Sequence, residues 1–524
     1  MGQRLNHGEE TKVLSKLGIN ESYQLAMYLL DQYRGTVLSC RYEIPPRLAS
    51  AESRTQLEES VKVAVVDTIM RHPMMQVGMK DATSKAPSWI QLHSLDLTQH
   101  IKWIYIEEHD DFEQTVQETF RAKIDERFPD LSIKQPGWWV TVIRQGDAPM
   151  MEVLLSWNHP QFDGAGAKVF HEDVLEILNV ENGTNERTGL DGDILKLPQA
   201  PPLLPIPIER SKGLPVDPKY LAKVFWEDVR PSFLNRDASL AAWCPIRTSP
   251  YKTQFRAFFM DQESLSAVLA LCRKNKTTIT GLIHGLALIA FSSHLNSTGA
   301  AAFQSSTIMD HRRNLPPAPP DAPWGKPDRA VANYVTQAFH RYGTRTVARI
   351  RSKLPADASE GADLSADLQR DLWAASARSR QDIVRRLEAG LRNDLVGVFK
   401  YVTDWQKTMS EQARKKRQFS WLVTNIGVLE GGNTPAAPDT ATAKQSPTDS
   451  DSKPDDAQKW SIGRAQFGLS AEIPAAAIEF SPVSVAGRGM CVSASWPDCA
   501  VDSMLGERIM ADMERWLAQL ASQP

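Results

Sequence analysis

Cysteine is scarce in this chain, and no two cysteines have the spacing of metal ligands or of a redox pair. The five cysteines lie far apart at Cys40, Cys244, Cys272, Cys491 and Cys499. Their odd number and wide spacing argue against a disulfide framework, and the absence of a CxxC pair argues against a zinc ribbon. We therefore expect reduced cysteines and no metal.

Long apolar runs and an excess of one charge are also missing. No window approaches the roughly 20 apolar residues that a membrane span requires, and the start, MGQRLNHGEE, has no apolar signal core. Lys and Arg number 60 against 63 Asp and Glu, a formal net charge of −3, whereas a nucleic-acid-binding protein should be strongly basic. These absences predict a cytoplasmic protein with no membrane span and no nucleic-acid partner.

The motifs of several common enzyme classes are absent as well. The sequence has no GxSxG nucleophile turn, no GxxxxGK[ST] phosphate loop, no HExxH zinc helix and no GxGxxG after a predicted strand. A serine hydrolase, a P-loop nucleotide hydrolase, a zinc protease and a dinucleotide-binding enzyme are therefore not favoured.

What is present is enough for two large domains. A chain of 524 residues exceeds one ordinary core, and its hydrophobic content of 42% can fill two. The proline-rich stretch 197–217 indicates a connector. We predict a first domain over 1–196, a connector over 197–250 and a second domain over 251–524. Residues 431–458 carry no large apolar side chain, which predicts a disordered insertion.

Helical and strand patterns mix in both parts, which predicts an α+β fold. In the first part we expect helices over 21–33, 54–71, 111–127 and 166–178, and strands over 36–44, 138–145 and 150–158. In the second part we expect strands over 251–260, 301–309, 419–427, 466–470 and 490–496, helices capped by Asp261 and by Thr278 or Thr280, helices within 367–415, and a last helix from 502.

A histidine and an aspartate four residues apart follow one of these strands. In WNHPQFDGAGAKVF (157–170), His159 ends an apolar strand and Asp163-Gly164 precedes an amphipathic helix. A neutral imidazole at a strand end can take a proton from a hydroxyl near neutral pH. Asp163 either braces the loop beneath the ring, faces away to pair with an arginine, or caps the helix, and Gly164 lets the backbone bend sharply. We interpret His159 as a general base supported by Asp163 and Gly164.

HPQFDG resembles the HxxxDG motif shared by CoA-dependent acyltransferases and the condensation domains of peptide synthetases. Its setting, LLSWNHPQFDGAGAKVFHEDVLEIL, is similar to the fungal alcohol acetyltransferase family, including trichothecene 15-O-acetyltransferase-like enzymes. Looser similarity extends over RHPMM (71–75), TTITGLIHGLALIAF (277–291), IMDHRRNLP (308–316) and VTNIGVL (423–429). The late DFGWG segment of plant-type relatives is matched only by Gln466-Phe-Gly-Leu, which departs in two residues.

The resemblance implies two chloramphenicol-acetyltransferase-like domains, each a mixed β-sheet flanked by helices, with an active-site tunnel at their interface. It implies acetyl-CoA as the cosubstrate. We also expect a monomer that uses no metal. The acceptor would be a small-molecule alcohol of secondary metabolism, such as a trichothecene or another terpenoid, or a polyketide alcohol. His159 would deprotonate its hydroxyl as it attacks the thioester directly.

The resemblance also assigns partners to the motif. The family's motif aspartate pairs with an arginine of the second domain, and Arg312 matches that position best, with Arg313 as the next choice; both are alternatively solvated surface charges. Thr424 and Asn425 match the place where relatives supply polar groups near the oxyanion or substrate, or are turn formers before Gly427.

Two other functions are compatible with these residues. A condensation-like domain acting on carrier-bound acyl groups usually carries a second histidine before the motif, and here that position is Asn158. A non-catalytic descendant with a decayed site is the other alternative, against which the intact His159, Asp163 and Gly164 argue.

Overall fold

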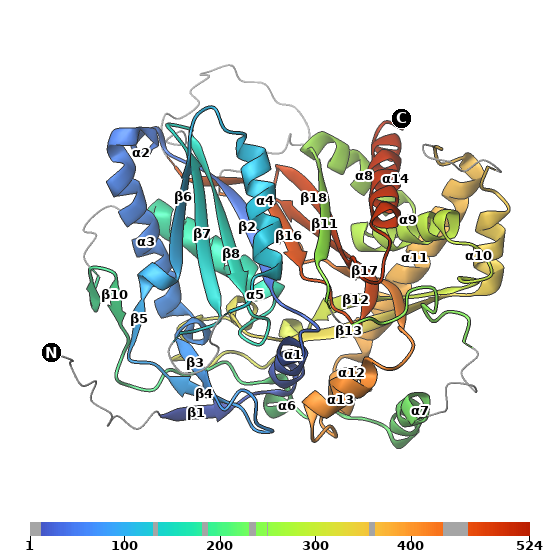
Figure 1. Ribbon diagram of the computed structural model, residues 1–524, viewed down its shortest axis with the longest axis horizontal. Coiled ribbons are helices and arrows are strands. Elements are labelled where there is room, and N and C mark those ends of the chain that lie inside the picture. The colour runs from blue at the N-terminus through green and yellow to red at the C-terminus, as the bar shows by residue number, and fades with distance from the viewer. Residues whose placement is uncertain are drawn as a thin grey trace, which may run out of the picture.

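Two β-sheets lie side by side and divide the molecule into an N-terminal and a C-terminal part (Figure 1). The computed structural model describes residues 12–128, 135–180, 187–229, 237–248, 250–355, 362–432 and 459–523. Most of the expected insertion at 431–458, namely 433–458, lies outside the described residues, as does 356–361 of the polar stretch before the helix at 366.

The N-terminal sheet has five strands and carries the histidine motif at the end of one of them. Its order is β16 (Ser461–Leu469), β2 (Thr36–Glu43), β8 (Met150–Trp157), β7 (Trp138–Gln145) and β6 (Ile101–Ile106). β7 and β8 form an antiparallel hairpin, and β8 lies inside the sheet between β2 and β7. Both faces of β8 are therefore buried, which explains its nearly continuous apolar sequence.

Helices cover both faces of this sheet. On one face, α3 (Arg54–Arg71) packs against α5 (Gly164–Val180), and both contribute to the largest apolar core. On the other face, α4 (Phe112–Asp125) buries Phe112, Val116 and Phe120 against β2 and β8. Asp111 caps α4 by accepting a hydrogen bond from the Gln114 backbone at 3.0 Å, so this helix begins where an acidic side chain can satisfy a free N–H.

The C-terminal sheet has seven strands, and its main path is mixed parallel and antiparallel. The order is β11 (Thr253–Met260), β18 (Gly489–Pro497), β17 (Ala476–Val485), β14 (Phe419–Thr424), β12 (Phe303–Asp310) and β13 (Val335–Tyr342), with β15 (Val428–Leu429) pairing with β17. Its outer face packs on α8 (Gln262–Lys274), α9 (Ile279–His294), α11 (Ala366–Ala389) and α14 (Ser503–Ala521). Asp261 and Thr278 cap α8 and α9 as expected.

Shorter elements close the ends of the two sheets. Two three-stranded sheets join β1 (Val13–Lys16), β4 (Ser88–Gln91) and β3 (Val77–Lys80), and β5 (Ser94–Asp96), β10 (Ile194–Lys196) and β9 (Leu190–Asp191). The remaining helices are α1 (Ile19–Leu29), α2 (Pro46–Ala49), α6 (Ile208–Ser211), α7 (Pro218–Val229), α10 (Thr344–Arg351), α12 (Leu395–Phe399) and α13 (Trp405–Gln412). The short helix α6 interrupts the proline-rich connector, which is otherwise without regular structure over 197–207.

One strand crosses between the two parts. β16 belongs to the C-terminal stretch of the sequence, yet it pairs antiparallel with β2 as the edge strand of the N-terminal sheet. It also packs on β17 and β18 of the C-terminal sheet. The predicted domain boundaries, 1–196 and 251–524, therefore differ from the division into sheets. Residues 461–469 lie in the second predicted domain but form the edge strand of the N-terminal sheet.

Three of the longer strands in the two main sheets are not predicted from the sequence: β6, β13 and β17. β17 contains Pro482, which argues against an interior strand because proline cannot donate to a sheet ladder. The structure resolves this conflict by register: β14 pairs with β17 only as far as Phe480, and β15 begins to pair at Ser484. Pro482 thus occupies the gap between two parallel pairings.

The crossing strand leads to a prediction about independent folding. Residues 1–196 expressed alone should not form a stable domain, because β2 would expose an unpaired edge and the core would lose the buried Ile462, Phe467 and Leu469. Near-UV circular dichroism and thermal unfolding of this fragment, compared with the full chain, test the prediction. A cooperative unfolding transition of the isolated fragment would contradict it.

Candidate active site

The histidine motif occupies the loop between β8 and α5, on the side of the N-terminal part that meets the C-terminal sheet. The Trp157 indole donates to the Phe162 carbonyl at 2.8 Å, and the Gln161 backbone donates to the Asn158 carbonyl at 2.9 Å. These bonds fold residues 158–163 into a compact turn. His159 is buried, with only 7% of its surface exposed.

Asn333, from the segment just before β13, holds His159 from the C-terminal part. Its amide nitrogen donates to the His159 backbone carbonyl at 2.9 Å and to the side-chain oxygen of Gln24. Both amide protons are then used, so the 3.3 Å approach of the same nitrogen to His159 Nδ1 is a contact without a donated proton. On the other side, the Tyr33 ring lies against the imidazole, with centroids 5.9 Å apart.

This arrangement sets the tautomer of the imidazole. The backbone carbonyl of His159 acts on its own ring and raises its pKa, and Nδ1 is the ring nitrogen nearest to the main chain. We therefore assign the ring proton to Nδ1 and the lone pair to Nε2. Within the described part of the chain, Nε2 has no hydrogen-bond partner. Burial lowers the pKa of His159, opposed by that backbone bond and by the charge of Asp163. The ring is therefore neutral at pH 7 and able to accept a proton.

Asp163 faces away from the imidazole and forms a two-point ion pair with Arg312. The two terminal guanidinium nitrogens donate to its two carboxylate oxygens, each at 2.8 Å. Asp163 also accepts the backbone N–H groups of Gly166 and Tyr334, both at 2.9 Å. Asp163 thus both caps α5 and pairs with an arginine, so two of the roles considered for this aspartate occur in the same structure.

Arg312 is itself buried and fully surrounded by acceptors. Besides Asp163, it donates to Asp310 at 3.0 Å and to the carbonyls of Ala330 and Ala332 at 2.8 and 2.9 Å. Burial alone would lower the pKa of Arg312, but the carboxylates of Asp163 and Asp310 raise it above its ordinary value. Arg313, the other candidate, is exposed. Residues 330–334 thus pack against the motif turn.

Gly164 is required for a reason other than the expected sharp bend. It opens α5, and its backbone is not in the left-handed region. A Cβ atom there would lie 2.6 Å from Ile426 Cγ2 and 3.1 Å from Phe467 Cζ. The glycine therefore lets the turn after β14 and the crossing strand β16 come close to the motif.

Thr424 and Asn425 lie at the turn that docks on Gly164. The Asn425 side-chain oxygen accepts the Gly427 backbone N–H at 2.8 Å, and its nitrogen donates to Thr280 at 3.1 Å. Gly427 has φ of +87°, as the tight turn requires. Asn425 is thus engaged in shaping the turn. Thr424 is buried at the end of β14 and remains a candidate for contact with an oxyanion.

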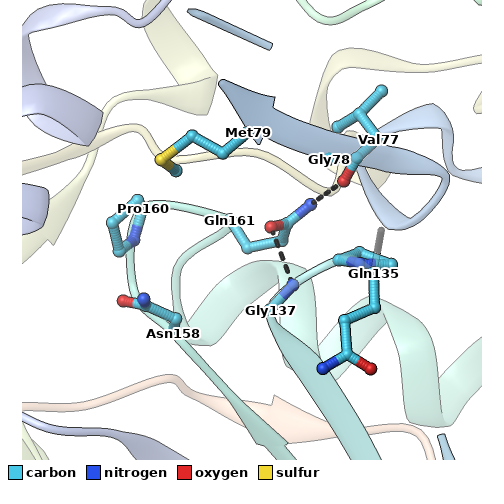
Figure 2. Close-up of a pocket in the computed structure, with 9 residues that line it drawn as sticks. Val77, Gly78, Met79, Gln135, Gly137, Asn158, Pro160 and Gln161 are labelled. Atoms are coloured by element: carbon cyan, nitrogen blue, oxygen red, sulfur yellow. Dashed lines mark hydrogen bonds between the residues drawn. The ribbon is translucent and has the colours of Figure 1, made fainter. Parts of the chain in front are cut away.

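Gln161, one of the variable residues of the motif, anchors the turn on its other side (Figure 2). Its oxygen accepts the Gly137 backbone N–H at 3.2 Å, and its nitrogen donates to the carbonyls of Met74 and Val77. A shallow depression beside it, too small to hold a water molecule, is also lined by Asn158. Both polar atoms of the Asn158 side chain are buried without a partner among the described residues.

Motif reasoning from the sequence misses Asn333, Tyr33, Gln24 and Gln161 as site residues. Asn333 lies 174 residues from His159 in a short segment, AVANYV, that has no motif. A polar residue within an apolar stretch was the one available hint. Among the described residues no group of three or more His, Cys, Asp or Glu side chains is placed to hold a metal ion, and no helix has the length and apolarity to cross a bilayer.

Comparison with known proteins shows which proteins this chain resembles. Residues 94–323 match the family model described as alcohol acetyltransferase. The chain is 24% identical over 528 residues to the probable alcohol acetyltransferase FCK4 of Fusarium pseudograminearum, covering 99% of this chain and 97% of that protein.

Solved structures share the fold over nearly the whole chain. TRI3 trichothecene 15-O-acetyltransferase from Fusarium sporotrichioides superposes with a TM-score of 0.65 at 13% identity, covering 98% of this chain and 97% of that one. The condensation domain of the Monacolin K polyketide synthase MokA gives a TM-score of 0.56 at 8% identity, with 98% of both chains covered. The α+β fold shared by acyltransferases and condensation domains is thereby confirmed, as is the expected resemblance to the fungal alcohol acetyltransferases.

The buried ion pair leads to a stability prediction. Asp163→Asn should lower the free energy of unfolding by about 3–5 kcal/mol, because it leaves the buried Arg312 charge without its main partner. Urea denaturation followed by tryptophan fluorescence measures the loss.

Asp310→Asn is the matched control for this measurement. Asp310 touches the same guanidinium, but 43% of its side chain is exposed, so its substitution should cost less than about 1 kcal/mol. An equal loss of unfolding free energy in the two variants would show that the Asp163–Arg312 contact stabilises the protein no more than the Asp310–Arg312 contact.

Proposed function

We propose that this protein is a CoA-dependent O-acetyltransferase, which transfers the acetyl group of acetyl-CoA to a hydroxyl of a small-molecule alcohol. The observation that carries the proposal is the buried, neutral imidazole of His159, whose Nε2 has no hydrogen-bond partner among the described residues. The alcohol acetyltransferase family match and the similarity to a probable alcohol acetyltransferase support the same chemistry.

The proposed reaction is a direct transfer with no acyl-enzyme. Nε2 of His159 takes the proton of the acceptor hydroxyl as its oxygen attacks the thioester carbonyl carbon. The tetrahedral intermediate then collapses, the carbon–sulfur bond breaks, and the imidazolium returns the proton to the leaving CoA thiolate. The Thr424 hydroxyl is the proposed donor to the oxyanion, since a fixed dipole in a water-poor site stabilises developing charge.

Asp163 and Arg312 act in this scheme as positioning residues. The carboxylate is occupied by four donors, so it does not relay a proton from the imidazole. Its role is to fix the turn that presents His159 to the proposed tunnel between the two parts. Both substrates would meet the histidine in that tunnel.

The acceptor class is proposed from composition and from a relative. We propose a terpenoid or polyketide alcohol, and the fold relative named as a trichothecene 15-O-acetyltransferase supports the terpenoid choice. The protein is further proposed to act as a cytoplasmic monomer.

A condensation-like activity on carrier-bound acyl groups is the second candidate, and the fold likeness to condensation domains favours it. Asn158 stands where such domains usually carry a second histidine. Transfer from free acetyl-CoA in the absence of any carrier protein distinguishes the two.

The proposal predicts that the purified protein converts acetyl-CoA and at least one alcohol of a terpenoid panel into an acetyl ester. Mass gain of the alcohol and release of free thiol measure the reaction. His159→Ala should lower kcat at least about a hundredfold, because general-base catalysis is lost. An unchanged thermal unfolding profile serves as the folding control. A near-normal rate in this variant would refute the base assignment.

The lowered pKa of His159 predicts the pH dependence of the reaction. Only the neutral ring accepts a proton, so kcat/KM should fall as pH drops through the pKa of His159. Burial lowers that pKa, and the midpoint of the acidic limb should therefore lie below the ordinary value of about 6.5. A midpoint at or above neutral pH would contradict the assignment of the buried imidazole as base.

A further inference from the structure

A carboxyl group is buried on the inner face of the C-terminal sheet, close to the proposed site. Glu479 lies in β17 and is 2% exposed. Its neighbours Ile478 and Phe480 point into the apolar core beneath α9 and α14. Because side chains alternate along a strand, Glu479 points to the opposite face, which meets the N-terminal part.

Several polar atoms around Glu479 lack partners. Its Oε1 accepts the Glu472 backbone N–H at 3.3 Å, whereas Oε2 is buried with no partner among the described residues. Ser495 pairs directly with Glu479 across β17 and β18, and its hydroxyl is likewise unpartnered. The buried Arg417, whose charge acts on Glu479, also has one guanidinium nitrogen, Nη2, without a partner.

Buried polar atoms in native proteins are almost always hydrogen-bonded, and each exception calls for an explanation. Here three such atoms belong to residues that are linked by strand pairing or by direct electrostatic interaction. Arg417 is held rigidly by its bonds to the Ala476 and Cys244 carbonyls, at 2.8 and 3.0 Å. Unpartnered polar atoms held in place in this way are able to hydrogen-bond a polar group of a bound molecule.

Two observations connect Glu479 with the catalytic histidine. The charges of Glu472 and Glu479 act on the hydroxyl of Tyr33, whose ring lies against His159. In addition, Glu479 stands opposite Leu422 of β14, two residues before Thr424 on the same face. Glu479 therefore shares the sheet face of Thr424, and its charge reaches the tyrosine that packs beside His159.

The free hydrogen-bonding capacity of Glu479 Oε2 and of the Ser495 hydroxyl indicates what the group binds. Burial and the nearby Glu472 raise the pKa of Glu479 well above its ordinary value, against the lowering effect of Arg417 and of the Glu472 backbone hydrogen bond. A neutral carboxyl both donates and accepts hydrogen bonds, which matches a hydroxyl. An ammonium group would instead need a carboxylate.

We propose that Glu479 binds a second hydroxyl group of the acceptor, so that the preferred substrate is a diol or polyol of which one hydroxyl is acetylated. Ser495 supports the same hydroxyl. This inference rests on the proposed acetyl transfer, and Glu479 determines specificity without touching the reacting atoms.

Acetyl transfer to a matched pair of alcohols tests the inference. The probes are p-menthane-3,8-diol and menthol, which share one skeleton and the secondary hydroxyl and differ in the second hydroxyl. The wild-type protein should show a kcat/KM for the diol at least about tenfold above that for menthol, as expected when one buried hydrogen bond discriminates. Glu479→Leu should bring this ratio close to one, whereas Glu479→Gln, which keeps a donor and an acceptor, should retain most of it.

Glu152→Gln is the control for loss of a buried carboxylate. Glu152 is buried in β8 and bonded to Ser39 and Arg41, so its substitution should leave the diol-to-menthol ratio unchanged. If alcohols are acetylated but the diol is not preferred, or if Glu479→Leu lowers both rates equally, the inference is wrong and the proposed function stands. If no alcohol is acetylated at all, the proposed function fails, and this inference with it.

Discussion

The buried ion pair between Asp163 and Arg312 is the contact on which the geometry of the site depends. Taking two charges out of water is costly unless good geometry and further hydrogen bonds compensate. Here both conditions are met, since the aspartate receives four donors and the arginine meets two carboxylates and two carbonyls. The partners are 149 residues apart in the sequence, so the pair ties the motif turn to the C-terminal part.

The position of that pair leaves the histidine free for chemistry. In a relay arrangement the carboxylate would bind the imidazole; here it is turned away, and the ring is oriented by its own backbone carbonyl and by Asn333. Within the six-residue motif, Asp163 thus fixes the turn, and His159 carries the proposed chemistry. The close approach of Ile426 to Gly164 adds a steric requirement, because a larger residue there would push apart the two parts that the ion pair joins.

The sequence predicts the parts of this site that depend on local pattern. His159, Asp163 and Gly164 follow from one spacing, and the apolar run of β8 places them at a strand end. Arg312 follows from a resemblance to a family motif. The contacts of Asn333 and Gln161 cannot be predicted in this way, because each depends on which distant segments the fold brings together. β17 is not predicted because Pro482 argues against an interior strand. The strand forms because its parallel neighbours pair with it only before and after the proline, at Phe480 and Ser484.

The two faces of the C-terminal sheet carry different side chains, and this difference bears on function. On the outer face Ile478 and Phe480 belong to an apolar core, whereas the inner face presents Glu479, Ser481, Ser493 and Ser495, all buried. Ser493 donates to the Phe467 and Ser481 carbonyls, but Glu479 Oε2 and the Ser495 hydroxyl have no partner among the described residues. A surface evolved only to join two domains would gain more from apolar contacts there. Buried polar groups with free hydrogen-bonding capacity lower the stability of such an interface. The two unpartnered atoms of Glu479 and Ser495 fit the proposed substrate hydroxyl, which would supply the hydrogen bonds that the interface itself does not.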